Sequence, residues 1–259
     1  MEVVRGLNFN HRGLPIAATV GSYDGVHFGH RVLLESTIRE AERIGGRSMV
    51  ITFDPHPRVV VDPTAEIKLL TTTEEKISLI AEMGVDLLVI IPFDREFSHT
   101  SPHDFIRILV EKLGVSSLVV GYDHQFGHAK SGDFKSLNSF SEEFGLNIIR
   151  IMEQEFDSRH VSSTVIRRLI LKGDIQLSNE MLGHRYIING EITPDNEFIP
   201  ASRNKLLPGI GLYRVGVGDR EYTLEITHQD PYSFVGEDTP RVGLTTIEFI
   251  EQLKYMTKI

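Results

Sequence analysis

The stretch TVGSYDGVHFGH, residues 19–30, lies where a short apolar run gives way to a segment with helical periodicity. It contains three glycines, which allow a backbone to approach a ligand closely. A helix is predicted to begin at Phe28, and a helix N-terminus offers unpaired N–H groups and the positive end of its dipole. His27 and His30 are three residues apart, so both side chains can face the same side. The stretch therefore predicts an anion site between a strand and a helix.

The same order of elements recurs on the C-terminal side of this stretch. Short apolar runs alternate with segments that mostly carry apolar residues at three- and four-residue steps. The predicted strands are residues 16–20, 49–53, 87–91, 118–120 and 147–151, and the predicted helices are residues 28–43, 73–83, 102–113 and 134–144. Near-continuous apolar strands joined by helices indicate an α/β fold, a Rossmann-like doubly wound parallel sheet. Ligands of such sheets lie beyond the carboxyl ends of the strands.

The pattern changes near Gly183. Two further helices are predicted over residues 163–172 and 175–181, and short alternating runs follow at 186–192, 212–217 and 221–226. The polar stretch at 193–208 is predicted to be a long loop, and residues 245–255 are predicted to be helical. We therefore expect an α/β domain over residues 1–184 and a second, smaller β-rich domain over residues 185–259.

The composition excludes several classes of protein. With 27 basic and 36 acidic residues the net charge is -9, which disfavours a protein that coats nucleic acid by neutralising phosphates. The absence of cysteine excludes a disulfide framework, a thiolate metal site and a cysteine nucleophile. No apolar run approaches the 18 or so residues of a membrane span, and the first ten residues do not resemble a signal peptide. We expect a cytoplasmic protein that binds small molecules, with no membrane or nucleic-acid partner.

A second stretch with anion-binding character is VSSTVIR, residues 161–167. Ser162 or Ser163 could simply cap the predicted helix. However, three hydroxyls at a helix start, with Arg167 one turn later, place donors, dipole and positive charge around one anion. Phosphate is the ligand that this combination favours.

Two further stretches follow predicted strands. In TFDPHP, residues 52–57, two prolines indicate a rigid loop on which a planar apolar ligand could rest against Phe53. The alternative is a rigid turn capped by Asp54. The second stretch, GYDHQFGH at residues 121–128, leads into a glycine-containing loop whose histidines are typical of solvated loop residues.

These stretches, in this order, resemble the nucleotidyltransferase domain of bacterial bifunctional riboflavin kinase/FAD synthetases over roughly residues 15–190. The histidine element of residues 27–30 is common to the wider superfamily of adenylyl- and cytidylyltransferases. The TFDPHP and SSTVIR stretches are similar to the FAD synthetase branch in particular. The resemblance implies transfer of AMP from ATP to FMN, giving FAD and pyrophosphate, with Mg²⁺ on the triphosphate.

The resemblance also implies roles for particular residues. His27 and His30 would stabilise charge on the ATP phosphates, and Arg167 would join Ser163 and Thr164 in holding the departing pyrophosphate. The residues implied in nucleotide binding are Gly21, Ser22, Tyr23, Asp24, Gly29, Asp123, Ser163 and Thr164. Those implied on the flavin side are Phe53, His56, Pro57 and Arg58. The resemblance leaves it unknown which side chains, if any, bind the metal.

The sequence departs from the family pattern at three places. Phe28 stands at a position that is often basic, and His124 stands where the family usually has phenylalanine. Residues 191–259 are shorter than a riboflavin kinase module and lack its Pro-Thr-x-Asn element, which predicts a truncated, degenerate kinase region. Two alternatives stay open: transfer to another phosphorylated acceptor, and a non-catalytic protein that binds flavin or nucleotide for regulation.

Overall fold

The chain forms two compact units in a computed structural model that describes residues 1–8, 13–62, 64, 66–121, 134–152, 155–156, 159–227 and 231–255. The α/β unit comprises Met1–Tyr23, Gly29–Ile67 and Ile77–Gln154. The barrel unit comprises Asp24–Phe28, Lys68–Lys76 and Glu155–Ile259. Residues 155–182, which carry two helices, thus group with the barrel. The functional division into residues 1–184 and 185–259 stays a prediction.

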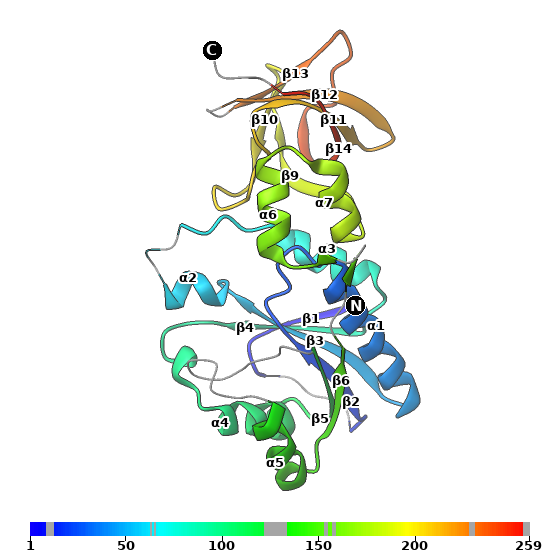
Figure 1. The fold of residues 1–259 in the computed structure, drawn as a ribbon, viewed down its shortest axis with the longest axis vertical. Coiled ribbons are helices and arrows are strands. Elements are labelled where there is room, and N and C mark those ends of the chain that lie inside the picture. Colours follow the sequence, from blue (N-terminus) through cyan, green and yellow to red (C-terminus); the bar gives the residue numbers. More distant parts are fainter. Residues whose placement is uncertain are drawn as a thin grey trace. The chain divides into compact units, whose positions relative to one another are not determined.

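The α/β unit is built on a six-stranded parallel sheet, as the alternation of strands and helices predicts (Figure 1). The strand order is β1-β4-β3-β2-β5-β6. The strands are β1 (Glu2–Arg5), β2 (Ile16–Val20), β3 (Arg47–Asp54), β4 (Leu87–Pro92), β5 (Val115–Gly121) and β6 (Asn147–Ile151). Every residue of β2 is buried, which means that both faces of the sheet centre are covered. The edge strand β1 was not predicted, because its four residues are mostly exposed and carry no apolar run.

The helices predicted between these strands are found close to their predicted ends, together with two short helices, α2 and η1, that were not predicted. They are α1 (Phe28–Arg43), α2 (Pro57–Val61), α3 (Thr73–Glu82), η1 (Phe97–His99), α4 (Pro102–Arg107), η2 (Ile108–Lys112) and α5 (Phe134–Phe144). The single helix predicted over 102–113 is α-helical in its first half and π-helical in η2. Its residues Phe105, Ile106 and Leu109 pack with residues of the sheet strands in one hydrophobic core. Within the described ranges, no helix combines the length and apolar composition that crossing a membrane requires.

The barrel unit contains a closed barrel with strand order β10-β13-β12-β11-β14-β9. The strands are β9 (Tyr186–Ile192), β10 (Glu197–Pro200), β11 (Gly211–Val217), β12 (Arg220–Ile226), β13 (Tyr232–Val235) and β14 (Gly243–Tyr255). Before the barrel come the hairpin of β7 (Glu155–Phe156) and β8 (Arg159–His160), and the helices α6 (Ser163–Leu171) and α7 (Ile175–Leu182). The expectation of a Rossmann-like domain with a smaller β-rich domain is confirmed.

Two predictions in this unit are wrong. Residues 245–255 form strand β14 rather than a helix, because β9 and β11 pair with it on both sides. Ile247 and Phe249 alternate into the barrel core, but the same apolar residues also fit a helical period. The stretch at 193–208 is not loop throughout, because β10 within it pairs with β9 and β13.

A buried carboxylate on α1 ties the helix to the sheet. Glu40 accepts hydrogen bonds from Ser117 Oγ at 2.7 Å, from Asn147 Nδ2 at 3.2 Å and from the guanidinium of Arg43. The hydrogen bond from Arg43, helped by those from Ser117 and Asn147, lowers the pKa of Glu40 to about 2, although burial acts in the opposite direction. The charged form of Glu40 is therefore the one that the fold stabilises.

We expect the substitution Glu40→Gln to cost stability in a pH-dependent way. The folded-state pKa lies below the ordinary value of 4.5, so the stabilisation is complete above that value and is lost as the pH falls toward 2. Because Arg43 is exposed and screened by water, we expect a contribution of about 1–3 kcal/mol. Urea unfolding of both proteins between pH 3 and 6.5 measures it. A stability difference that does not change with pH would contradict this account of Glu40.

Candidate functional site

The loop between β2 and α1 has an unusual backbone. Tyr23 has φ 48°, Gly25 φ 90° and Val26 φ 42°, all in the left-handed region. A positive φ is costly for a β-branched residue such as Val26, and such strain persists only where the surroundings hold it. A Cβ added to Gly25 would approach Leu70 Cδ1 to 2.8 Å, so the loop is also closely packed at this point. The surroundings of residues 24–26 therefore fix the backbone that leads into residues 27–30, which we call the histidine motif.

Within the barrel unit, three distant residues hold this loop by its backbone. The Oγ1 of Thr71 accepts a hydrogen bond from the N–H of Gly25 at 3.0 Å. The Nε2 of His184 lies 2.9 Å from the backbone oxygen of Gly25, and Ser163 Oγ donates to the backbone oxygen of Asp24 at 2.9 Å. Thr71 and His184 carried no signal in the sequence, because their role depends on contacts across 46 and 159 positions.

The buried side chain of Asp24 forms an ion pair with Arg167, whose side chain is 17% exposed. Asp24 is 2% exposed, and its Oδ2 accepts a hydrogen bond from Arg167 Nη2. The other oxygen, Oδ1, accepts from the N–H of Thr71 at 3.0 Å. Arg167 Nε in turn donates to the backbone oxygen of Lys68 at 2.9 Å. The guanidinium is thus oriented at two points, and its expected contact with phosphate stays a prediction.

The three hydroxyl residues at the start of α6, Ser162, Ser163 and Thr164, have different contacts. Ser162 is the N-cap, because its Oγ accepts a hydrogen bond from the N–H of Val165 at 3.4 Å. Ser163 instead bonds to the loop at Asp24, and Thr164 is exposed. Of the two capping alternatives, the structure therefore selects Ser162. The barrel unit also contains His27, which is 7% exposed.

Gly29 and His30 of the histidine motif lie in the α/β unit. His30 is in the first turn of α1 next to Gly29, and its ring meets the ring of Tyr23 edge to face, with centroids 5.1 Å apart. The phenol of Tyr23 lies 2.8 Å from Thr19 Oγ1, and burial raises its pKa. At Gly21 a Cβ would lie 3.1 Å from the Tyr23 ring. His30 therefore makes a packing contact, and its predicted role toward phosphate remains to be tested.

The loop around Ser22 continues this packing. Its backbone oxygen accepts a hydrogen bond from Thr52 Oγ1 of β3 at 3.3 Å. The loop that follows β2 is thus joined to the neighbouring strand at the carboxyl edge of the sheet, where ligands of parallel sheets lie.

The predicted flavin residues lie where β3 ends. The ring of Phe53 packs against those of Phe93 and Phe97, with centroid separations of 5.3 and 6.2 Å. His56 Nδ1 accepts a hydrogen bond from the N–H of Arg58 at 3.2 Å and so caps α2, of which Pro57 is the first residue. The structure thus shows Phe53 in an aromatic cluster and the other three at the start of a short helix.

The alternative left open for this stretch, a turn capped by Asp54, is not what the structure shows. His56 is the cap, and Asp54 Oδ2 lies 3.7 Å from Arg5 Nη1 of β1. The helix α2 was missed because it has only five residues. Asp123 and the rest of the loop at residues 122–133 lie outside the described residues.

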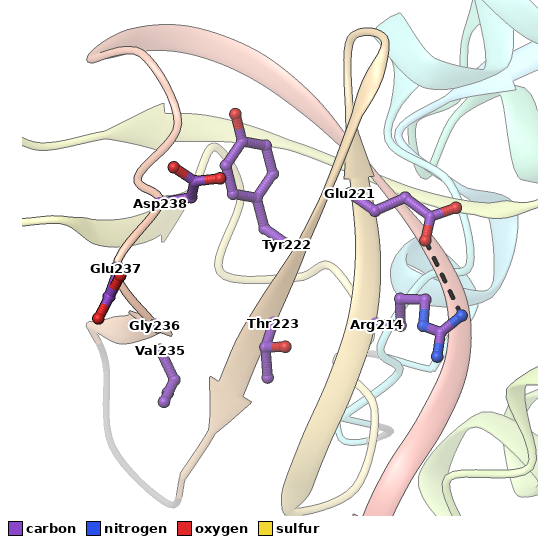
Figure 2. A pocket seen from close by; sticks show the side chains of 8 residues that line it. All are labelled: Arg214, Glu221, Tyr222, Thr223, Val235, Gly236, Glu237 and Asp238. Atoms are coloured by element: carbon purple, nitrogen blue, oxygen red, sulfur yellow. Dashed lines mark ion pairs between the residues drawn. The ribbon is translucent and has the colours of Figure 1, made fainter.

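A separate hollow of about 450 Å³ lies on the barrel (Figure 2). Its lining consists of Arg214, Glu221, Tyr222, Thr223, Val235, Gly236, Glu237 and Asp238. Arg214 pairs with Glu221 at 3.9 Å, as the dashed line in Figure 2 marks. The lining carries three carboxylates and one guanidinium, and this excess of negative charge is unfavourable for phosphate groups. Among the described residues, no three histidine, aspartate or glutamate side chains are placed to hold a metal ion together.

Comparisons with known proteins show which family the chain is related to. The model of the family described as FAD synthetase matches residues 11–165, more than half of the chain. The bifunctional riboflavin kinase/FMN adenylyltransferase of Listeria monocytogenes is 31% identical over 76% of this chain and 66% of its own length. The enzyme of the same name from Escherichia coli is 31% identical over 85% of this chain and 75% of its own length.

A solved structure shows the same fold. A macrolide-efflux protein from Streptococcus pneumoniae aligns over 100% of this chain and 93% of its own, with a TM-score of 0.83 and 19% identity. The chain spans about two thirds to three quarters of the length of the two curated relatives, which fits the expected shortening of the kinase region. The histidine motif, Ser162 and Ser163 fall inside the matched region, and the chain belongs to the FAD synthetase family of nucleotidyltransferases.

Proposed function

We propose that this chain is an FMN adenylyltransferase. An oxygen of the FMN phosphate attacks the α-phosphorus of ATP in line, the bond to the β-phosphate oxygen breaks, and FAD and pyrophosphate result. The observation that carries the proposal is the ion pair of the buried Asp24 with Arg167, which joins the loop of the histidine motif to the first turns of α6. Both stretches were predicted to bind phosphate. Residues 19–30 lie inside the region that matches the family, and residues 161–167 overlap its C-terminal end at residue 165.

Such a reaction needs positioning and charge stabilisation more than covalent chemistry. His27 and His30 stabilise the negative charge that develops on the transferring phosphate. Arg167, Ser163 and Thr164 hold the departing pyrophosphate. The fixed guanidinium supports this role, because a preoriented donor loses no orientation at the moment of reaction.

The remaining assignments follow the same motifs. The backbone around Gly21, Ser22 and Tyr23, together with Gly29, approaches the nucleotide, Asp24 orients Arg167, and Asp123 binds the sugar or base. Phe53, His56, Pro57 and Arg58 serve the flavin. The exposed Arg58 at the start of α2 supports the last assignment, since a guanidinium is suited to a phosphate group. We further propose a cytoplasmic location.

Mg²⁺ fits this site as an ion that is bound mainly by the phosphates of the nucleotide. Asp24 is a carboxylate of the site, but its oxygens are engaged by Arg167 and Thr71. Mg²⁺ is often bound through substrate phosphates with few protein ligands. When bound, it neutralises charge on the triphosphate, and the side chains named above orient the phosphates.

The direct test is the full chain with FMN, ATP and Mg²⁺, followed by chromatographic separation of the flavins. We expect FAD to form in a Mg²⁺-dependent way, with an equal amount of pyrophosphate. Flavin binding without FAD would favour the regulatory alternative. The absence of both FAD and flavin binding would favour another phosphorylated acceptor, and either result would overturn the proposal.

We also expect the chain to lack riboflavin kinase activity. Phosphoryl transfer requires a phosphate cradle and metal ligands, and the C-terminal sequence lacks the Pro-Thr-x-Asn element. The acidic lining of the hollow on the barrel supports the same expectation. The measurement uses riboflavin, ATP and Mg²⁺ without FMN. Enzyme-dependent appearance of FMN or FAD would show that the barrel retains a working kinase site.

A further inference from the structure

Lys205 places a positive charge inside the barrel unit. Its side chain is 1% exposed, and its Nζ donates to Glu75 Oε2 at 2.7 Å and to the backbone oxygen of Leu70. The Nζ also lies 4.4 Å from the ring centroid of Tyr186. Burial lowers the pKa of Lys205, and the charge of Glu75 acts in the opposite direction. A buried cation is tolerated here because it has a carboxylate partner.

We call the segment Lys68–Lys76 the strap. Glu75 belongs to the strap, and its ion pair with Lys205 holds the strap in place. Glu75 Oε2 accepts a hydrogen bond from the N–H of Thr72 at 2.8 Å, and Oε1 accepts from the N–H of Asn189 in β9 at 2.8 Å. Lys205 binds the strap at Leu70, and Glu75 binds it at Thr72. The pair therefore fixes the backbone on both sides of Thr71.

Thr71 is the residue through which the strap contacts the histidine-motif loop. Its N–H donates to Asp24 Oδ1, and its Oγ1 accepts from the N–H of Gly25, both at 3.0 Å. Asp24 in turn orients Arg167. A continuous series of hydrogen bonds thus leads from Lys205 through Glu75 and the strap to Arg167, and all of it lies within the barrel unit.

Stability alone does not explain a charged pair at this place. The desolvation of two buried charges largely offsets their attraction, so an apolar pair of similar volume often stabilises a fold as well or better. An apolar pair cannot bind a backbone N–H or C=O in one defined direction, whereas hydrogen bonds to charged groups can. The arrangement is suited to holding the strap at one position.

We infer that Lys205 is a positioning residue for adenylyl transfer, which acts through Glu75 and the strap to place Asp24 and Arg167. This inference rests on the proposed function. It implies that the C-terminal region, which resembles a truncated kinase module, contributes to the adenylyltransferase reaction through a residue that does not touch the substrates.

The test compares kcat and KM for ATP and FMN in variants of the full chain. Lys205→Met alone leaves Glu75 as an uncompensated buried charge and risks unfolding, so the main variant is the double substitution Glu75→Gln/Lys205→Met. It removes both charges and keeps the volume. Thr71→Val removes the hydroxyl contacts of the strap with the N–H of Gly25 and with Asp24 Oδ1, and it keeps the bond from the Thr71 N–H to Asp24. Lys254→Met is a matched control, because Lys254 is an exposed lysine of the same barrel.

We expect the double variant and Thr71→Val to lower kcat per folded molecule on the order of 10-fold or more, with KM for ATP changed less than about twofold. Lys254→Met should match the parent. A purely structural role would lower the melting temperature and the folded fraction without changing kcat per folded molecule.

The outcomes separate this inference from the proposed function. A parent chain that forms no FAD overturns the proposed function, and the inference fails with it. An active parent with an equally active double variant overturns the inference alone. Loss of kcat in the double variant but not in Thr71→Val, or an equal loss in Lys254→Met, also overturns it, because the effect would not pass through the strap.

Discussion

Replacing His30 with alanine is expected to lower kcat for FAD formation by about 10²- to 10³-fold, with a much smaller effect on nucleotide binding. The reason is that charge stabilisation that strengthens in the transition state is expressed in kcat. Loss of one such preorganised donor has an effect of this size. Steady-state kinetics with ATP and FMN, together with an ATP-binding measurement, separate the two quantities.

The contact of His30 with Tyr23 requires a control, because alanine also removes packing. His30→Leu keeps apolar volume beside the Tyr23 ring and removes the ring nitrogens, so it should lose as much kcat as His30→Ala. His103→Ala serves as the matched control, since His103 pairs with Glu143 at 2.8 Å on a different helix. Near-parental turnover in His30→Leu, with a lower melting temperature in His30→Ala, would show that His30 is structural.

Arg167→Met is expected to have two effects. It leaves the carboxylate of Asp24 buried without its cation, which should destabilise the fold by about 3–5 kcal/mol. It should also lower kcat by about 10²- to 10³-fold, because the clamp on the departing pyrophosphate is lost. Denaturant unfolding measures the first effect, and the FAD assay measures the second.

The double variant Asp24→Asn/Arg167→Met distinguishes the two effects. Removing both charges should restore most of the stability, because no uncompensated buried charge remains. Turnover should stay low. Arg167→Lys adds a further comparison, since lysine keeps the charge but lacks the planar fork that bonds to both Asp24 and Lys68. Parental kcat in the double variant would show that Arg167 does not bind phosphate.

The amino-acid pattern was sufficient for the α/β unit. The strand at Ile16–Val20 and the helix at Phe28–Arg43 were predicted with their observed ends, because a buried parallel strand is continuously apolar and an amphipathic helix has a clear period. The strands of the barrel were harder to predict from the sequence. In β14, residues 245–255 fit either period, and only the pairing with β9 and β11 selects the strand.

The candidate site also has a part that the sequence predicts and a part that only the tertiary structure shows. Local sequence identified the histidine motif, the hydroxyl-rich start of α6 and Arg167, because glycines, caps and charges near helix starts have local physical consequences. The partner of each group was not predictable. Asp24 and Arg167 are 143 positions apart, and Glu75 and Lys205 are 130 apart. A buried charge needs a partner, but which residue supplies it depends on how distant segments fold together, and that information is not contained in any local pattern.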